Sequence, residues 1–478
     1  MPERPAGEFV GDLEGPVATV GADGTVEPLG SPWRVGWAVG AEDRWHVAAQ
    51  EAAVRTRLVD DMPVVATAMK VPGGDVVQQV AAVTAGARRG VVVEFVNETP
   101  VPVSLALAVT GSAKRAGVRG SQLLVGDLTA VELGRVPGGA AAVSDGQVWN
   151  EVRSGPPPGD CQASSRAGLA AAVAVLPLAR NVPLRVCLPA DGGASVLGSP
   201  GQVAAGWQAM VAGAASAELP DATAVRAWRR GIPASILAAG GAEPEAAARA
   251  AIVLDQVGLP DEADRARAVV ADAVERSRPQ PEVAVVVLRA LASRRLRAGR
   301  DSGLAERAGP LVAAAGDRLD RLTLEQAAAV LGVEAPAVAR DAHRLLIETP
   351  RDSAPGTATG DGLAAAVRDS ITFGGDGLAG IEAALDCLAA EAPDHLVVLP
   401  ALPGDWKGAP LDVRGLATRH GLLSFSVRWH GSRPALLWER VPPTHRPLSP
   451  VPLRCGLDQS WQSEAPAGEA LLGPGNVA

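Results

Sequence analysis

The stretch His395-Leu-Val-Val-Leu-Pro-Ala-Leu-Pro-Gly-Asp-Trp406 marks a change in the character of the chain. It begins as an apolar run and ends on two prolines, which cannot continue a helix. Residues 380–391 before it have the apolar spacing of a helix, whereas a Gly-rich pattern of alternating side chains runs from it to Trp438. The sequence therefore predicts a helical block that is closed by a small β-domain.

The β-domain contains one clear hairpin. Residues 423–429 alternate between apolar and polar side chains, His430-Gly431 has turn chemistry, and residues 434–440 return. The last stretch, 441–478, is rich in proline and glycine and is expected to wrap the surface.

The first 200 residues are typical of a β-sandwich, with many short apolar runs between glycines and prolines. In the clearest part, 91–109, two such runs flank the turn-like segment 97–100. Alternation through Val103 and Val109 predicts one buried face. Further strands are expected at 64–71, 79–83, 170–176 and 184–188.

The apolar period changes to that of a helix near Gly201. Short loops join the expected helices, several of which begin with proline, and this favours antiparallel α-hairpins. No repeat of fixed length is visible, so a regular solenoid is the less favoured alternative. The expected helices include 202–217, one capped by Asp221, and 244–257, 260–276, 282–298, 302–315, 323–331, 336–347, 361–370 and 378–391.

The predicted fold is thus a multidomain β and α protein. It has an N-terminal β-sandwich (1–200), an α/α helical-hairpin domain (201–394) and a C-terminal β-cap with a tail (395–478).

This order resembles that of bacterial glycoside hydrolases of the six-hairpin type, which join a β-sandwich, an α/α toroid and a C-terminal β-domain. The similar segments are Leu399-Pro-Ala-Leu-Pro403 with Trp406, the Gly415-Leu416 to Gly421 strand pair, and the passage 207–228. All are packing and turn signatures. The resemblance implies a toroid, but 201–391 is short for six hairpins, so either the helices are short or the toroid is incomplete, with one or more hairpins missing. That stretch also has few aromatic residues: between Arg229 and Leu396 there is no Trp and only one Phe.

Glycoside hydrolysis requires two carboxyl groups that flank the scissile bond. Asp376, between glycines, and Glu243, just before a helix, are the catalytic candidates. The alternative for each is a helix-start carboxylate that caps the helix or complements its dipole. Less distinctive candidates are Asp261, Glu334 and Asp361.

A second cluster lies near the N-terminus. Trp33, Trp37 and Trp45 occur close to Arg34, Arg44 and His46, a combination that is able to bind a sugar or a partner. The alternative is that these rings pack in the core or on a strand face.

Composition excludes several other classes. The charge of −9 is spread along the chain without a basic stripe, which argues against a nucleic-acid partner. No apolar run reaches the roughly 18 residues of a membrane span, and the first residues lack a signal-peptide pattern, so a cytoplasmic location is expected. The cysteines and His46 have no metal-ligand spacing, so no metal is expected. Gly73-Gly-Asp75 is typical of a hairpin turn and not of a dinucleotide fingerprint, and no cofactor is expected. The sequence leaves the oligomeric state open.

These observations favour a glycoside-hydrolase-like protein that has lost catalysis and has a carbohydrate-related binding or structural role. One alternative is an active inverting glycosidase that acts on a small oligosaccharide. The other is a scaffold whose helical domain binds a protein, which predicts an exposed apolar patch on that domain.

Overall fold

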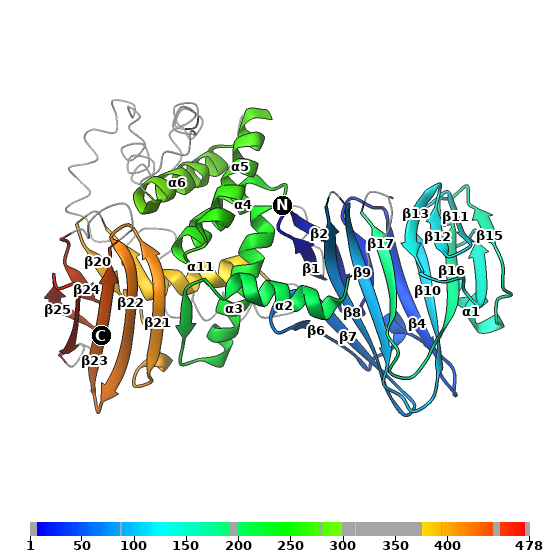
Figure 1. The fold of residues 1–478 in the computed structure, drawn as a ribbon, viewed down its shortest axis with the longest axis horizontal. Coiled ribbons are helices and arrows are strands. Elements are labelled where there is room, and N and C mark those ends of the chain that lie inside the picture. The colour runs from blue at the N-terminus through cyan, green and yellow to red at the C-terminus, as the bar shows by residue number, and fades with distance from the viewer. Residues whose placement is uncertain are drawn as a thin grey trace. The chain divides into compact units, whose positions relative to one another are not determined.

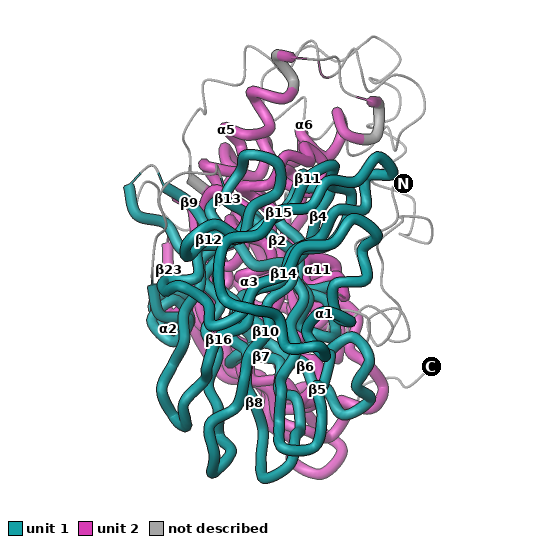
Figure 2. Tube along the Cα trace, turned by 90° about the vertical axis from the view of Figure 1, so that its right-hand side faces the viewer, with its two compact units in different colours: residues 1–12, 16–210 teal, residues 13–15, 211–478 magenta. Residues whose placement is uncertain are grey.

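The computed structural model describes residues 7–86, 88–190, 198–276, 280–298, 311, 375–392, 394–442 and 450–473. The chain forms two compact units, residues 1–12 with 16–210 and residues 13–15 with 211–478 (Figure 2). The main division therefore lies close to the predicted change of character near residue 201. The described helices after residue 211 and the C-terminal strands belong to one unit, whereas the sequence divides them at 394/395 by type of secondary structure.

The first unit is built on two antiparallel sheets that pack face to face, as the sequence predicted (Figure 1). Trp37 of the first sheet contacts Phe95 of the second, with ring centroids 5.5 Å apart. The first sheet has the order β1 (Gly7–Asp12), β2 (Gly15–Gly21), β3 (Val26–Pro28), β4 (Trp33–Gly40), β10 (Val103–Gly111), β16 (Ala171–Leu178) and β14 (Gly139–Val143), and β5 (Trp45–Val47) pairs with β4. The second has the order β15 (Cys161–Ser164), β11 (Arg115–Arg119), β12 (Gln122–Val125), β13 (Leu128–Glu132), β17 (Leu184–Pro189), β9 (Arg88–Asn97), β8 (Gly74–Ala85), β7 (Met62–Val71) and β6 (Val54–Val59).

The strands that flank the turn-like segment 97–100 do not pair with each other. β9 belongs to the second sheet and β10 to the first, so the chain crosses between the sheets at this point. The Asn97 side chain fixes the crossing, because its Nδ2 donates to the Val101 carbonyl at 2.8 Å and its Oδ1 accepts from the Thr99 amide at 2.9 Å.

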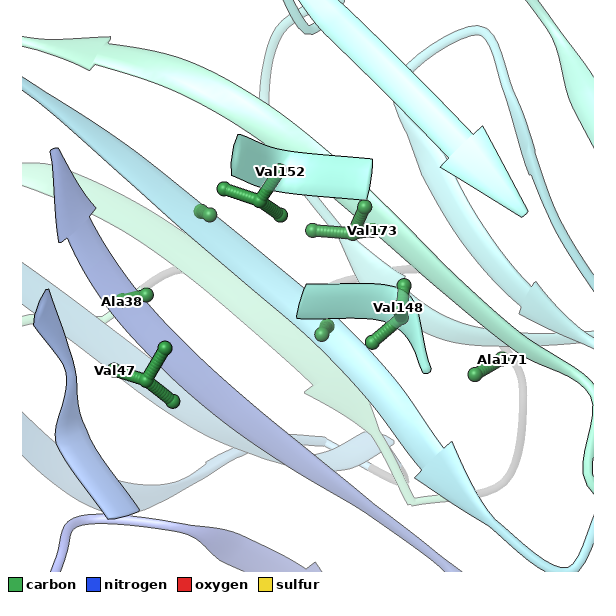
Figure 3. Packing of buried hydrophobic residues seen from close by; sticks show 8 residues of the cluster. Ala38, Val47, Val148, Val152, Ala171 and Val173 are labelled. Atoms are coloured by element: carbon green, nitrogen blue, oxygen red, sulfur yellow. The ribbon is translucent and has the colours of Figure 1, made fainter. Parts of the chain in front are cut away.

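β10 also corrects the prediction of a single buried face. Its residues from Leu105 to Val109 are all buried, because helix α1 (Val148–Ser154) covers the outer side of the sheet. Figure 3 shows Val148 and Val152 of this helix above Ala38, Val173 and their neighbours. A one-turn 3-10 helix, η1 (Ala48–Gln50), follows β5.

Helix α2 (Pro200–Val211) packs Ala204 against Val64, Val83 and Val92 of the second sheet. The prediction that this helix continues to residue 217 is wrong. It ends at Val211, and β18 (Ser216–Glu218) pairs instead with a strand of the C-terminal sheet.

The second unit contains helices α3 (Ala222–Ala239), α4 (Pro244–Gln256), α5 (Pro260–Arg276), α6 (Pro281–Ala298) and α11 (Gly377–Leu388). Asp221 caps α3 as predicted, since its carboxylate accepts from the Thr223 amide at 2.9 Å. α3 and α11 touch closely at Gly231, where an added Cβ would lie 2.4 Å from Cβ of Ile381. Apart from residue 311, the helices predicted at 302–315, 323–331, 336–347 and 361–370 lie outside the described residues. The toroid therefore stays a prediction.

The C-terminal part of this unit consists of two small sheets (Figure 1). The first has the order β18, β21 (Leu411–Thr418), β22 (Gly421–His430), β23 (Arg433–Val441) and β26 (Ala467–Leu471); the second has the order β19 (Ala389–Glu391), β20 (Leu396–Val398), β24 (Leu453–Cys455) and β25 (Asp458–Ser463). The predicted hairpin is confirmed, with His430 opposite Arg433. Trp438 and Trp461 join the sheets edge to face, 5.1 Å apart.

The junction at 395–406 consists of a short strand, a turn and a 3-10 turn. β20 ends at Val398, and the chain turns at the next residue, Leu399, which has a positive φ of 51°. A 3-10 turn, η5 (Gly404–Trp406), then places Trp406 in the interior, where it is 4% exposed. The predicted helix 378–391 ends earlier, at Leu388, and the described part of the tail forms strands. No described helix combines the length and apolarity needed to cross a membrane.

Candidate functional site in the sandwich

A row of polar side chains crosses four strands on the outer face of the first sheet. The register places Thr19 opposite Glu27 and Arg34 opposite Thr110, while Val26 opposite Val35 belongs to the inner face. Because side chains alternate along a strand, Thr19, Glu27, Arg34 and Thr110 all point to the outer side. Two hydroxyls, a carboxylate and a guanidinium are thus aligned across the sheet.

Helix α1 places an aromatic ring beside this row. Trp149 is half-buried and packs against the apolar cluster under α1. The next outward position on β4 is Gly36, and an added Cβ there would lie 3.3 Å from Cζ2 of Trp149. Glycine therefore leaves room for the indole to lie against the sheet.

The row and the ring border a cleft of about 520 Å³. This size is within the range of small-molecule sites. We call it the Trp149 cleft. Its lining consists of Thr19, Gly21, Ala22, Asp23, Thr25, Glu27, Arg34, Gly36, Trp37, Val47, Ala49, Thr110 and Trp149.

The charged groups of the cleft differ in how firmly they are held. Asp23 accepts hydrogen bonds from the amide and the hydroxyl of Thr25, at 2.9 and 2.8 Å. Arg34 and Glu27 are only loosely paired, with Nη1 and Oε1 3.5 Å apart and side-chain exposures of 58% and 49%. Such an exposed pair contributes little to stability. Both residues line the cleft, so the pair offers exposed donors and acceptors there.

The structure separates the three tryptophans that the sequence grouped together. Trp33 and Trp37 are buried, 8% and 1% exposed, and the Trp37 indole donates to the Asp23 carbonyl at 3.0 Å. Trp45 lies on the outer face, against Gly40. Of the three, only Trp37 lines the Trp149 cleft.

The neighbouring charged residues form a loop cluster. Arg44 donates to Glu51 at 2.6 Å, and the ring of buried His46 lies 2.9 Å from Asp43 and 3.2 Å from Glu51. Hydrogen bonds lower two pKa values here: that of Glu51, chiefly through Arg44, and that of Asp43, chiefly through His46. The cluster fixes the conformation of the loop beside β5.

Trp149 was missed by the sequence analysis. The signal was the segment Val148-Trp-Asn-Glu-Val152, in which two valines four residues apart define the buried side of one helical turn. Sequence alone does not show which sheet that side covers.

The two predicted catalytic carboxylates lie at helix starts in the second unit. Asp376 caps α11, because its Oδ1 accepts from the Ala379 amide at 3.1 Å. Glu243 occupies the corresponding position before α4, but its side chain makes no capping bond and is exposed. Neither carboxylate lines the Trp149 cleft. Of the lesser candidates, Asp261 lies in the first turn of α5, whereas Glu334 and Asp361 fall outside the described residues.

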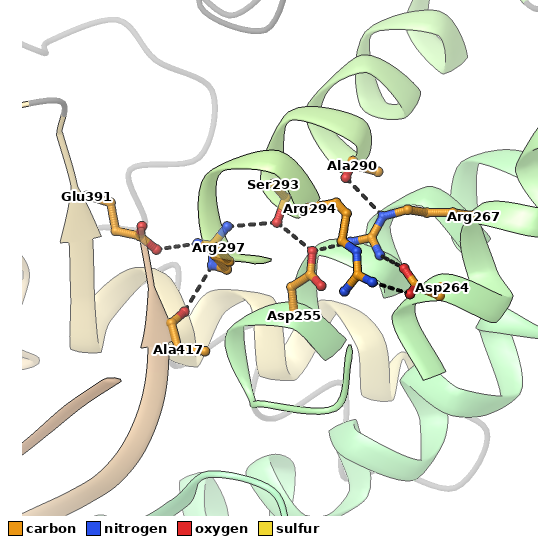
Figure 4. Close-up of polar contacts among 9 residues, drawn as sticks. All are labelled: Asp255, Asp264, Arg267, Ala290, Ser293, Arg294, Arg297, Glu391 and Ala417. Carbon is orange, nitrogen blue, oxygen red and sulfur yellow. Dashed lines mark hydrogen bonds and ion pairs between the residues drawn. The ribbon is translucent and has the colours of Figure 1, made fainter. Parts of the chain in front are cut away.

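Charged side chains of α4, α5 and α6 form a largely buried network (Figure 4). Arg267 of α5 pairs with Asp255 of α4, and each side chain is 3% exposed. Ser293 of α6 donates to Asp255 at 2.8 Å and accepts from Arg297 at 2.7 Å. Burial raises the pKa of Asp255 and lowers the pKa of Arg267, so desolvation opposes the ion pair.

The network continues to the strands. Arg297 pairs with Glu391 of β19 and donates to the Ala417 carbonyl of β21 at 2.9 Å. Arg294 and Arg267 both pair with Asp264. The charged groups of the network are thus paired with one another inside the unit, which indicates a structural role.

Among the described residues of the second unit, the large apolar side chains that are exposed do not lie on the helices, where the scaffold hypothesis expected them. They are Leu422, Leu437, Val441 and Leu471, each 42–49% exposed. The register puts all four on one face of the C-terminal sheet, mixed with polar residues such as Ser424 and Glu439.

No family model matches the chain, and no curated protein matches it. Among solved structures, the chain is similar to a bacterial glucoamylase complexed with acarbose, with a TM-score of 0.43 and 9% identity. The match covers 64% of this chain and 59% of the glucoamylase, so the chain spans less than two thirds of that protein. The finding is a distant structural resemblance to a glycoside hydrolase.

Proposed function

We propose that this protein binds a carbohydrate in the Trp149 cleft and that it is a non-catalytic, glycoside-hydrolase-like protein. The observation that carries the proposal is the position of Trp149. Its half-buried indole lies beside Gly36 and shares a cleft with the exposed Arg34–Glu27 pair.

This combination suits the two surfaces of a sugar. The apolar C–H face of a pyranose packs against an aromatic ring, as other apolar groups do. The hydroxyls need donors and acceptors side by side, which the guanidinium, carboxylate and threonine hydroxyls of the polar row supply. Because Arg34 and Glu27 are exposed and 3.5 Å apart, a ligand hydroxyl gains bonds to them without breaking a buried pair.

The non-catalytic part rests on the roles of the predicted carboxylates. Asp376 is engaged as a helix cap, and Glu243 is exposed at a helix start. A catalytic acid and base instead flank the scissile bond within one site. An inverting glycosidase is the competing proposal.

Calorimetry with gluco-oligosaccharides tests binding, and two tryptophans on the same face of the sheet provide matched variants. Trp149→Ala removes the ring of the cleft and is expected to weaken binding by on the order of tenfold or more. Trp45→Ala, at a residue that does not line the cleft, should bind as the wild type does. Gly36→Val keeps the indole but displaces it, and should also weaken binding.

Equal affinity in the wild type and the Trp149→Ala variant would exclude this cleft. The same sugars should be followed for hydrolysis, with Asp376→Asn and Glu243→Gln as variants. Turnover by the wild type that one of them abolishes would replace the non-catalytic proposal with the glycosidase.

A further inference from the structure

A second cleft, of about 510 Å³, lies in the same unit and is also bordered by α1. Its lining comes from β14, the loop that follows it, α1 and β15. The residues are Ala142, Val143, Ser144, Asp145, Gln147, Asn150, Glu151, Ala163 and Ser164. We call it the Glu151 cleft.

The two clefts lie on opposite flanks of one short helix. α1 has seven residues and faces the sheet with Val148 and Val152. Successive helical residues are about 100° apart, so Trp149 projects to one flank, and Gln147 and Glu151 project to the other. The clefts are therefore separated by about the width of a helix, roughly 10 Å.

The two clefts offer different chemical groups: the Trp149 cleft has aromatic rings, and the Glu151 cleft has polar groups alone beside small apolar ones. The Glu151 cleft has no aromatic residue, but it has hydroxyl, amide and carboxylate groups. Two of these side chains are held by hydrogen bonds. The Asp145 carboxylate accepts from the backbone amide of Gln147 at 3.0 Å, and the Asn150 Oδ1 accepts from the Arg153 guanidinium at 3.2 Å. This cleft is thus suited to bind hydroxyl groups without stacking.

We infer that one extended oligosaccharide occupies both clefts, with one unit against Trp149 and a later unit on the polar groups beyond α1. The inference rests on the function proposed above and adds the length of the ligand to it. Carboxylates outnumber cationic groups in both linings, with Asp23 and Glu27 against Arg34 in one, and Asp145 and Glu151 without a basic residue in the other. The ligand is therefore a neutral oligosaccharide, because carboxylate-bearing sugars would be repelled.

Linking two weak contacts in one molecule makes the second contact intramolecular, so affinity rises without any change in the first cleft. A ligand too short to pass over α1 gains nothing. We expect affinity to rise by about tenfold or more at the length that first spans the helix, and to level off beyond it.

The experiment is calorimetry on the full chain with ladders of malto- and cello-oligosaccharides, from the monosaccharide to the hexasaccharide. The wild type should show a step in affinity along the ladder. The double variant Gln147→Ala, Glu151→Ala should lose this step. Arg166→Ala, at an exposed position shortly after β15 that lines neither cleft, should keep the step. Oligogalacturonates of the same lengths should bind more weakly.

The outcomes separate the two proposals. A flat ladder in the wild type, with binding that still depends on Trp149, would overturn the extended ligand and leave the proposed function intact. A step that persists in the double variant would also overturn it. The absence of binding at every length would overturn both.

Discussion

Two arginines, one in each unit, differ in their exposure and in the number of their hydrogen bonds. Arg34 in the sandwich is 58% exposed and lies 3.5 Å from Glu27, within a cleft. Arg267 in the helical part is 3% exposed and bonds to Asp255, Asp264 and the Ala290 carbonyl (Figure 4). The second arginine is saturated by its own unit, whereas the first has donors that are open to a ligand. A charged residue is therefore a candidate for ligand binding when its hydrogen-bonding groups are not all bonded within the protein, whatever its residue type.

The largest expected effect is in the buried pair. Arg267→Leu leaves Asp255 as a buried carboxylate without its main partner, and we expect the free energy of unfolding to fall by about 3–5 kcal/mol. Arg34→Leu should change it by less than about 0.5 kcal/mol. Hydrogen exchange of the amides in α4 and α5 during urea titration measures the loss in that part of the chain.

The double variant Asp255→Leu, Arg267→Leu sharpens this comparison. Removing both charges also removes their desolvation, so much of the stability should return. Equal losses for Arg267→Leu and Arg34→Leu would contradict the distinction between the two arginines.

A smaller effect separates the two helix-start carboxylates. Asp376→Ala removes the acceptor of the Ala379 amide and should destabilise the second unit by about 1 kcal/mol. Glu243→Ala removes no capping bond and should stay within about 0.5 kcal/mol. Thermal unfolding of both variants measures this difference, and a larger loss for Glu243→Ala would show that its carboxylate has a partner in the folded protein.

The smallest effect is the pH dependence of the Arg44–Glu51 pair. The pair lowers the pKa of Glu51 below its ordinary value of 4.5, so between the two values the unfolded chain binds more protons than the folded one. The stabilisation is therefore present above pH 4.5 and is lost as the pH falls through the lowered pKa. We expect the wild type to exceed Glu51→Gln in stability at neutral pH and to converge with it in acid.

Unfolding of these two proteins at a series of pH values tests this expectation, with the exposed neighbour Glu42→Gln as a control. High salt should reduce the difference, because Arg44 is 56% exposed. A difference between the wild type and Glu51→Gln that stays constant into acid would exclude the ion pair as its cause.

Local patterns predicted much of the fold. The hairpin at 421–441 and the helices that begin at Pro244 and Pro260 follow from alternation, turn residues and proline at the helix start. The sandwich was predicted from many short strands. Those patterns did not predict which strands pair with each other. The segments of β9 and β10 have the sequence pattern of a hairpin, but the two strands belong to different sheets.

The candidate site shows the same limit. The sequence analysis grouped Trp33 and Trp37 with Arg34 in one candidate cluster, whereas alternation along β4 puts both tryptophans on one face of the sheet and Arg34 on the other. The ring that does border the cleft comes from α1, far away in the sequence. Only tertiary packing, through Gly36 and the apolar cluster under the helix, brings Trp149 to Arg34.

The pairing of β18 with β21 has a topological consequence. It joins residues 216–218 to residues 412–414, so everything between them is a loop closed by a short strand pair. The helical part is, in this sense, an insertion into a β-sheet. Because the entropy of closing a loop grows only slowly with its length, helical hairpins can be added to or removed from such a segment at little thermodynamic penalty, provided that the closing strands remain.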